Sequence, residues 1–223
     1  MKNEPDNSFE YLKRHICYRL CPADTDLPSI PYFDMAISFY LMMYNSSAHV
    51  TDHDLSSHTD SVGIDADADM DTGADDKTDK PKVEIIKNAL DDGIFDVQNG
   101  CLIAPVDEYS LKLWHCTVDD LLPIAQDNTP IMNPSITRVI ASDGVLLETT
   151  SGLYSATAML YKSALTETAS VLGDNFLLLP ISEKCAICTN GLSIDHAKDL
   201  IRRESTLTKH VYQYLRGEIS ALE

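Results

Sequence analysis

A stretch of 36 residues, Asn45 to Lys80, divides the chain and most constrains how it can fold. It holds ten Asp, no Glu and two Lys, so eight of the chain's 18 net negative charges lie there. The stretch has few large apolar side chains, and such a segment buries too little surface to offset the entropy lost on ordering. We therefore expect a disordered acidic insertion, and a fold built from the apolar sequence on either side of it.

The chain has 223 residues, which is the usual length of one domain. We expect residues 1–44 to supply an N-terminal helix and the first strand, and residues 81–223 to supply the remainder of the same domain. The alternative is that 45–80 links a short N-terminal part to a larger C-terminal one. If it is an insertion, a short Gly/Ser loop in its place should change the stability by less than about 1 kcal/mol, because loop-closure entropy grows only logarithmically with length.

Two apolar patterns precede the insertion. From Ser8 onward, apolar residues recur every three or four positions, which predicts a helix over 8–20 that Pro22 ends. The next run has a period of two and predicts a strand over 33–43, with the odd positions from Met35 to Leu41 on one buried face. The even positions at its start, from Asp34 to Ser38, are expected to face solvent.

Helical and strand patterns interleave after the insertion. Asn99-Gly100 is typical of a hairpin. Thr117 with Asp120 predicts a helix start, in which Pro123 should cause a kink or a tightened first turn. We expect helices at 83–90, 118–125, 156–172 and 193–203, and strands at 94–97, 101–106, 144–149, 176–179, 185–189 and 210–214. Helices mixed with antiparallel hairpins predict an α+β fold, with a mixed, mainly antiparallel sheet.

Several strings resemble a known family: ICYRL (16–20), PYFDMAISFYLMM (31–43), LKLWHCTVDDLLPIAQDNTP (111–130), GDNFLLLPISEKCAIC (173–188) and HVYQY (210–214). They are similar to domain-of-unknown-function family 5688 of gut Firmicutes and, more distantly, to a family typified by a Bacillus open reading frame. The similarity covers residues 9–44 and 101–215. Its most specific residues are Leu113, Trp114, Thr117, Val118, Leu122, Asn128, Thr129 and Pro130, with Leu179 and Pro180 further on.

This resemblance implies a related fold and no assigned activity. Members of the family usually carry a further N-terminal region that this sequence lacks. The acidic insertion is a second departure, because it separates the strand at 33–43 from the strand at 101–106.

The cysteines could be read as a zinc site. Cys185 and Cys188 have C-x-x-C spacing, and Cys17 and Cys21 could complete a set of four ligands. In a strand, however, residues three apart point to opposite faces, and the pair at 17 and 21 belongs to an apolar helix face. We therefore expect all six thiols to be buried or inert, with neither zinc nor an obligatory disulfide.

The acidic stretch resembles a calcium loop, but its register is wrong. The sixth position, where an EF-hand needs Gly, is Met70. Three histidines in the same stretch lack any supporting shell of hydrogen bonds. We predict weak cation attraction and no specific metal site for this group: His49, His53, His58, Asp65, Asp67, Asp69, Asp71, Gly73 and Asp76.

Nucleophile-like strings occur at His115-Cys116 and at Glu148–Gly152. Neither matches a known nucleophile motif, and the sequence contains no phosphate-binding Gly loop and no H-E-x-x-H. We therefore assign no catalytic, cofactor-binding or metal-binding residue, and expect no cofactor. The leading hypothesis is a non-catalytic interaction or regulatory module. The alternative is a hydrolase or metal-dependent enzyme in which His115, His196 and His210 converge with a carboxylate.

Charge and hydropathy restrict the partners. A net charge of −18 repels phosphate backbones, and no basic cluster is longer than Arg202-Arg203, so we expect no nucleic acid. The sequence has no uncharged apolar run of 18 residues, and its first residues do not resemble a signal peptide. We therefore expect a cytosolic protein that binds another protein and no membrane.

Overall fold

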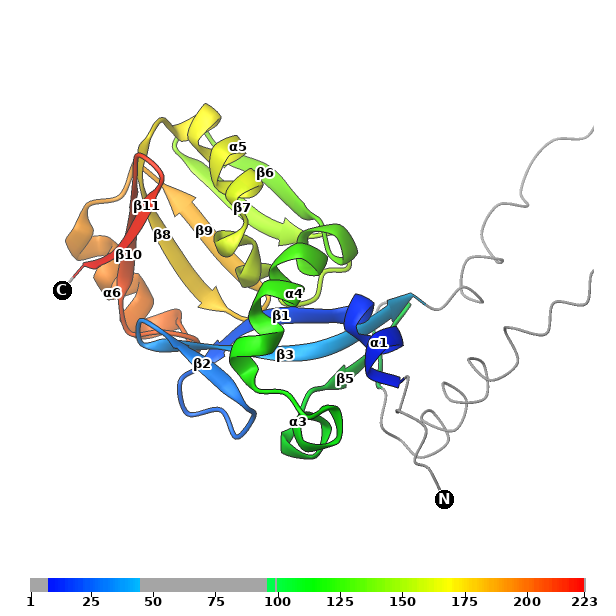
Figure 1. Ribbon diagram of the computed structural model, residues 1–223. Coiled ribbons are helices and arrows are strands. Elements are labelled where there is room, and N and C mark those ends of the chain that lie inside the picture. The colour runs from blue at the N-terminus through cyan, green and yellow to red at the C-terminus, as the bar shows by residue number, and fades with distance from the viewer. Residues whose placement is uncertain (1–7, 45–95, 99, 223) are drawn as a thin grey trace, which may run out of the picture.

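The computed structural model describes residues 8–44, 96–98 and 100–222 of the chain. These residues form two antiparallel sheets with helices packed on them (Figure 1). The α+β class expected from the sequence is therefore confirmed. The acidic insertion at 45–80 and the predicted helix at 83–90 lie outside the described residues.

The first sheet, sheet A, is built around the long strand β3 (Met35–Tyr44). Along one edge β3 pairs with β1 (Ile16–Pro22). Along the other edge it pairs first with β2 (Ser29–Tyr32) and then with β5 (Cys101–Pro105), and β4 (Asp96–Gln98) lies beyond β5. Sheet A therefore joins sequence from before and after the insertion.

The two features predicted for this sheet are confirmed. β3 occupies the run of period two, and its odd positions from Met35 to Leu41 all lie in one large cluster of buried apolar side chains, which we call the main core. β4 and β5 form the predicted hairpin, with Gln98 paired to Cys101. Gly100 in the turn has a φ of 76°, a left-handed conformation that glycine adopts at no steric cost.

The second sheet, sheet B, has six strands in the order β11-β10-β8-β9-β7-β6, all antiparallel to their neighbours. β7, β8, β9 and β10 confirm the strands predicted there, with bounds that differ by up to three residues. β6 and β11, the two edge strands, were not predicted. The strands are β6 (Ser135–Ala141), β7 (Gly144–Thr149), β8 (Asn175–Ser182), β9 (Cys185–Thr189), β10 (Val211–Leu215) and β11 (Glu218–Leu222).

Helices cover both sheets (Figure 1). α4 packs across β1 and β3, whereas η3 and α5 pack on one face of sheet B and α6 packs on the strands β8 and β10. The helices are α1 (Ser8–Leu12), η1 (Lys13–His15), α3 (Glu108–Trp114), α4 (Val118–Met132), η3 (Ser155–Leu160), α5 (Lys162–Leu172) and α6 (Ile194–Glu204). α6 confirms the helix predicted over 193–203.

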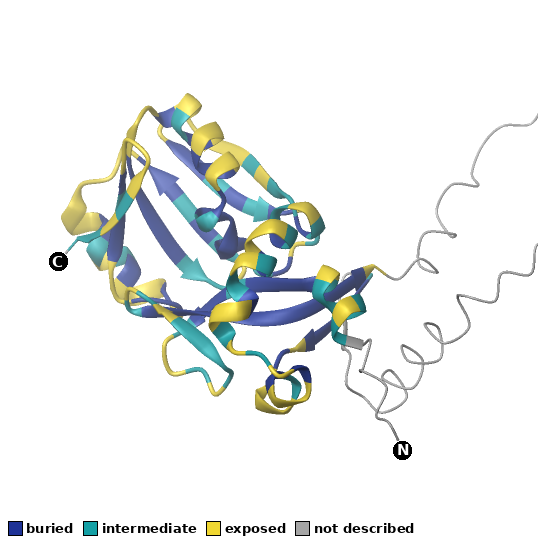
Figure 2. Cartoon of the chain, in the orientation of Figure 1, coloured by how far each residue is buried: buried dark blue, intermediate teal, exposed yellow. Residues whose placement is uncertain are grey.

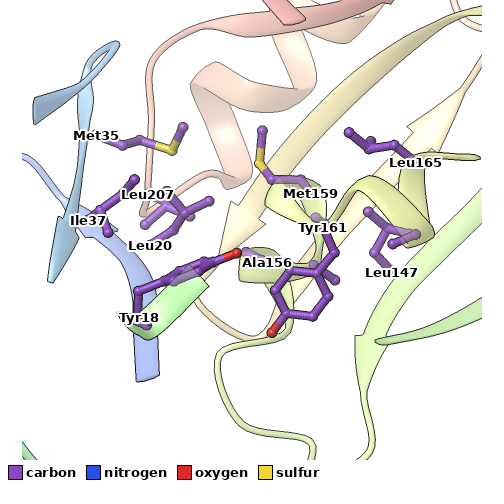
Figure 3. Close-up of a cluster of buried hydrophobic side chains, with 14 of the residues drawn as sticks. Tyr18, Leu20, Met35, Ile37, Leu147, Ala156, Met159, Tyr161, Leu165 and Leu207 are labelled. Carbon is purple, nitrogen blue, oxygen red and sulfur yellow. The ribbon is translucent and has the colours of Figure 1, made fainter. Parts of the chain in front are cut away.

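The main core lies where the two sheets meet. Figure 2 shows that the strands are largely buried while the outer turns of the helices are exposed. In Figure 3, Tyr18 and Ile37 of sheet A lie opposite Leu147 of sheet B, with Met159 and Tyr161 between the two sheets. Residues on either side of the insertion therefore share one core.

The start of α4 confirms the predicted helix cap. The Thr117 hydroxyl accepts the Asp120 backbone N–H, and the Asp120 carboxylate accepts the Thr117 backbone N–H at 2.8 Å, which completes a capping box. The helix then runs through Pro123 and Pro130 to Met132, seven residues past the predicted end.

The helix predicted over 8–20 is wrong beyond residue 15. The helical turns end at His15, and Ile16 already has extended backbone angles (φ −75°, ψ 121°). Cys17 and Cys21 are as buried as Ile16 and Leu20, so the segment is apolar on both faces. A strand covered on both faces reads as a continuous apolar run, and the three- and four-residue spacing within it is incidental.

Long-range hydrogen bonds hold this segment as an edge strand. The backbone N–H of Tyr18 donates to Thr129 Oγ1 at 2.9 Å, and that of Leu20 donates to Thr157 Oγ1 at 3.1 Å. The side-chain amide of Asn128 donates to the main-chain carbonyls of Lys13, in η1, and of Ile16, the first residue of β1. Side chains thus form hydrogen bonds with backbone groups of this edge strand that would otherwise be unpaired.

The even positions at the start of β3 do not face solvent as expected. Ala36 and Ser38 are buried, and Ser38 Oγ accepts a hydrogen bond from Arg19 Nε at 3.1 Å. The reason is that β3 is a central strand buried on both faces. Further along its second face, the β3 side chains Tyr40 and Met42 pack against Leu153.

The helix predicted over 156–172 is interrupted. Tyr161 is extended (φ −85°, ψ 119°) and separates the 3-10 helix η3 from α5. Its ring is buried in the core and its hydroxyl donates to the Asn133 carbonyl at 3.2 Å, so tertiary contacts override the local helical pattern. Gly173 ends α5 as predicted, with a φ of 82°.

Candidate functional site

A groove of about 1010 Å³ opens where sheet A meets sheet B. We call it the inter-sheet groove. Its walls come from β1, β2 and β3 on one side, from α4, η3 and the start of α5 on another, and from the β10–β11 hairpin. Lys162 is the only charged residue in its described lining, although acidic residues outnumber basic ones by 35 to 17 in the whole chain.

Aromatic side chains dominate one wall. The rings of Tyr32 and Phe33 meet edge to face with centroids 4.8 Å apart, and Phe33 lies 5.1 Å from the ring of Tyr212. Tyr18 meets Tyr161 edge to face at 6.2 Å. Such rings provide a large apolar surface with few rotatable bonds, which suits a recognition surface.

Phe33 stands out among these residues. It is 49% exposed, and its φ of 55° places a bulky residue in the left-handed region. Such a conformation costs of the order of 1 kcal/mol and persists only where the surrounding structure enforces it. The turn between β2 and β3 therefore presents an aromatic ring to solvent at the edge of the groove.

The neighbouring residue, Asp34, fastens this turn to sheet B. Its carboxylate accepts hydrogen bonds from the Thr208 hydroxyl (2.7 Å), the Lys209 backbone N–H (2.8 Å) and the Tyr212 hydroxyl. His210 Nδ1 lies 3.0 Å from the same carboxylate. These contacts, which we call the Asp34 clamp, join the β2–β3 turn to the segment that leads into β10.

The clamp is poorly suited to acid–base chemistry. Burial alone would raise the pKa of Asp34, but the hydrogen bonds from Lys209, Tyr212, Thr208 and His210 outweigh it and hold that pKa well below its usual range. Burial, followed by the bond to Asp34, raises the pKa of Tyr212 far above neutrality. Neither group exchanges a proton near neutral pH, where a general acid or base must.

The three histidines of the enzyme hypothesis have separate surroundings. His115 is the left-handed cap of α3 and lines a different hollow of about 570 Å³, together with Cys116. His196 Nδ1 lies 3.0 Å from Ser193 Oγ at the start of α6. Among the described contacts of these three, only His210 meets a carboxylate.

The cysteines also lie apart from the groove. Cys185 is half-buried and Cys188 is buried in β9, where residues three apart point to opposite faces. Burial raises the pKa of both Cys17 and Cys188 to about 12, and burial followed by the Asp120 charge raises the pKa of Cys116. None of these thiols is activated as a nucleophile.

In the described part of the chain, no three His, Cys, Asp or Glu side chains are placed to share a metal ion. The candidate cation residues of the acidic stretch, from His49 to Asp76, lie outside the described residues.

The hydroxyl-rich string at 148–152 is used for structure. The Thr149 hydroxyl is buried and donates to the Leu153 carbonyl at 2.7 Å. The Ser151 hydroxyl donates to Asn133 Oδ1 at 2.8 Å. Both contacts shape the turn after β7, so this string is not a free nucleophile.

Sequence reasoning missed the residues that form the groove. Tyr32 and Phe33 lie in a run whose period of two indicated only a strand, and Lys162 lies in a predicted helix. The one available signal was Asp34, a charged residue beside a buried strand, which should have a partner. Nothing in the sequence identifies that partner as the segment from Thr208 to Tyr212.

Three comparisons with known proteins find no match: no family model matches the sequence, no curated protein is significantly similar, and no solved structure is significantly similar. The resemblance to family 5688 therefore stays a prediction.

None of the helices in 8–44 and 100–222 has the length and apolar character needed to cross a membrane.

Proposed function

We propose that this protein is a non-catalytic interaction module that binds an apolar segment of another protein in the inter-sheet groove. The observation that carries the proposal is Phe33, a half-exposed aromatic ring in a strained turn that the Asp34 clamp holds against Tyr212. Strained, exposed aromatic residues are typical of recognition surfaces. The groove around Phe33 offers further aromatic and aliphatic surface to the same segment.

The enzyme alternative has less support. Among the described residues, the one His–carboxylate pair is His210 with Asp34, and that carboxylate already accepts hydrogen bonds from three other groups. A hydrolase or metal enzyme would need a free carboxylate or an activated nucleophile facing a cavity.

The net charge of −18 repels nucleic acids and acidic lipid surfaces, and therefore favours a protein as the partner. A cytosolic location and membership of family 5688 remain part of the same proposal. The support for the family lies in the strings at 111–130 and 173–188.

The test is an affinity capture from the native cell with three versions of the full chain. Phe33→Ala removes the exposed ring at the groove. Ile131→Ala, the matched control, removes an apolar side chain that is 76% exposed and lies outside the groove lining. We expect one protein that wild type and Ile131→Ala retain and Phe33→Ala loses at least tenfold. Equal capture by all three, with circular dichroism confirming folding, would refute the groove as the binding site.

A further inference from the structure

The charge in the inter-sheet groove is opposite in sign to that of the protein. Lys162 is the single ionic group in the described lining, which contains no Asp or Glu. The chain as a whole carries 35 acidic residues against 17 basic ones. A lining free of carboxylates in so acidic a protein favours a ligand that is mainly apolar and carries a negative group.

Lys162 is also the first residue of α5, an 11-residue helix whose N-terminus lies at the groove. Its N-cap, Tyr161, makes no side-chain capping hydrogen bond, and the first backbone N–H bonded back into the helix is that of Leu165, which donates to the Tyr161 carbonyl. Such a helix start carries unpaired donors and the positive end of the helix dipole.

A second, independent donor comes from sheet A. Tyr18 is only 4% exposed, and its ring meets that of Tyr161 at 6.2 Å. Figure 3 shows the Tyr18 side chain directed from β1 toward η3 and Tyr161. Tyr18 lines the groove, and its hydroxyl makes no hydrogen bond within the described residues. Burial raises the pKa of Tyr18, so the hydroxyl keeps its proton and can donate a hydrogen bond to a ligand in the groove.

We propose that the groove binds the C-terminal end of a partner protein. The terminal carboxylate would accept hydrogen bonds from the start of α5 and from the Tyr18 hydroxyl and pair with Lys162. The last apolar side chains would pack on Tyr32 and Phe33. This inference rests on the proposed function, and it adds the chemistry of the segment that is bound.

A terminal carboxylate suits this groove better than an acidic side chain. It is attached directly to the main chain, so no linking methylenes separate the charge from the last apolar side chain, and no chain has to leave the groove beyond it. Capture of terminal carboxylates by backbone N–H groups is a recurrent mode of peptide recognition. Charge-assisted hydrogen bonds to these donors would be stronger than bonds to a neutral amide.

The probe is a pair of synthetic peptide pools with N-acetyl groups and neutral Gly/Ser spacers. In both pools the last three positions are varied among Leu, Ile, Val, Phe and Met. One pool ends in a free carboxylate and the other in a carboxamide. Retention of each pool on the immobilised full chain is measured by mass spectrometry, and we expect the acid pool to be retained at least tenfold better.

The variants locate the carboxylate. Lys162→Met and Tyr18→Phe should each reduce retention of the acid pool severalfold and leave the amide pool unchanged. The matched controls are Lys184→Met, which removes an exposed positive charge outside the groove, and Tyr109→Phe, at a tyrosine that is 72% exposed. Neither control should alter the retention of either pool.

The outcomes separate this inference from the proposed function. If both pools are retained equally and Phe33→Ala abolishes retention of both, the groove binds apolar segments and the carboxylate inference is overturned. If the acid preference persists in Lys162→Met and Tyr18→Phe, the carboxylate lies elsewhere and the inference also fails. If neither pool is retained, the proposed function itself fails.

Discussion

Replacing Asp34 with Ala should destabilise the protein far more than replacing any exposed carboxylate. The Asp34 side chain is 24% exposed and accepts hydrogen bonds from Thr208, Lys209 and Tyr212, with His210 at 3.0 Å. Each buried donor left without an acceptor costs about 1–3 kcal/mol, and these costs are not additive within one network. Water will reach some of the freed donors, so we expect a loss of about 3 kcal/mol in the free energy of unfolding.

The assay is urea unfolding followed by fluorescence of Trp114, the single tryptophan, which lies in the main core. The matched control is Asp26→Ala, which removes the same charge from an exposed position in the loop between β1 and β2. Its effect should stay within about 0.5 kcal/mol. If Asp34→Ala lowers the free energy of unfolding by no more than Asp26→Ala does, the Asp34 clamp does not hold the sheets together.

The pH dependence provides a second check. The pKa of Asp34 is lowered in the folded protein, whereas an Asp in an unfolded chain has a pKa of about 3.9. The contribution of Asp34 to the free energy of unfolding is therefore complete above its pKa in the unfolded chain. It is lost as the pH falls toward its pKa in the folded protein. The stability difference between wild type and Asp34→Ala should be constant down to about pH 5 and should shrink from there to pH 2. A difference that grows in acid would contradict this assignment.

Three further predictions concern the core, the covered edge and the thiols. Ile37→Asp places a charge on the buried face of β3 and should abolish the unfolding transition, whereas Ile131→Asp at an exposed site should keep it. Thr129→Val removes the acceptor of the Tyr18 backbone N–H and should cost about 1–3 kcal/mol in urea unfolding. Purified protein should hold far less than one equivalent of zinc by atomic emission; stoichiometric zinc that Cys185→Ser removes would contradict this.

Features that depend on neighbouring residues were readable from the sequence. The period of two in β3, the Gly100 hairpin, the Thr117 cap and the Gly173 helix end are each decided by contacts within a few residues. The interleaving of helical patterns with antiparallel hairpins likewise predicted an α+β fold.

Features that depend on distant residues were decided only by the tertiary structure. β1 is a strand rather than a helix because β3 pairs along one edge and Thr129, 111 residues after Tyr18, caps the other. Tyr161 breaks a helical pattern because its hydroxyl reaches the Asn133 carbonyl.

The inter-sheet groove also depends on residues that are distant in the sequence. Phe33 and Lys162 come together there because two sheets with different strand orders pack on one core, and the Asp34 clamp draws on residues some 174 positions away. Local spacing carries no information about which distant side chain completes a hydrogen bond, since many pairings satisfy the same periodicity. Local sequence therefore determined β3, the Gly100 turn, the Thr117 cap and the Gly173 helix end, whereas the packing of the two sheets decided that β1 is a strand and where a groove without acidic residues in its described lining would open.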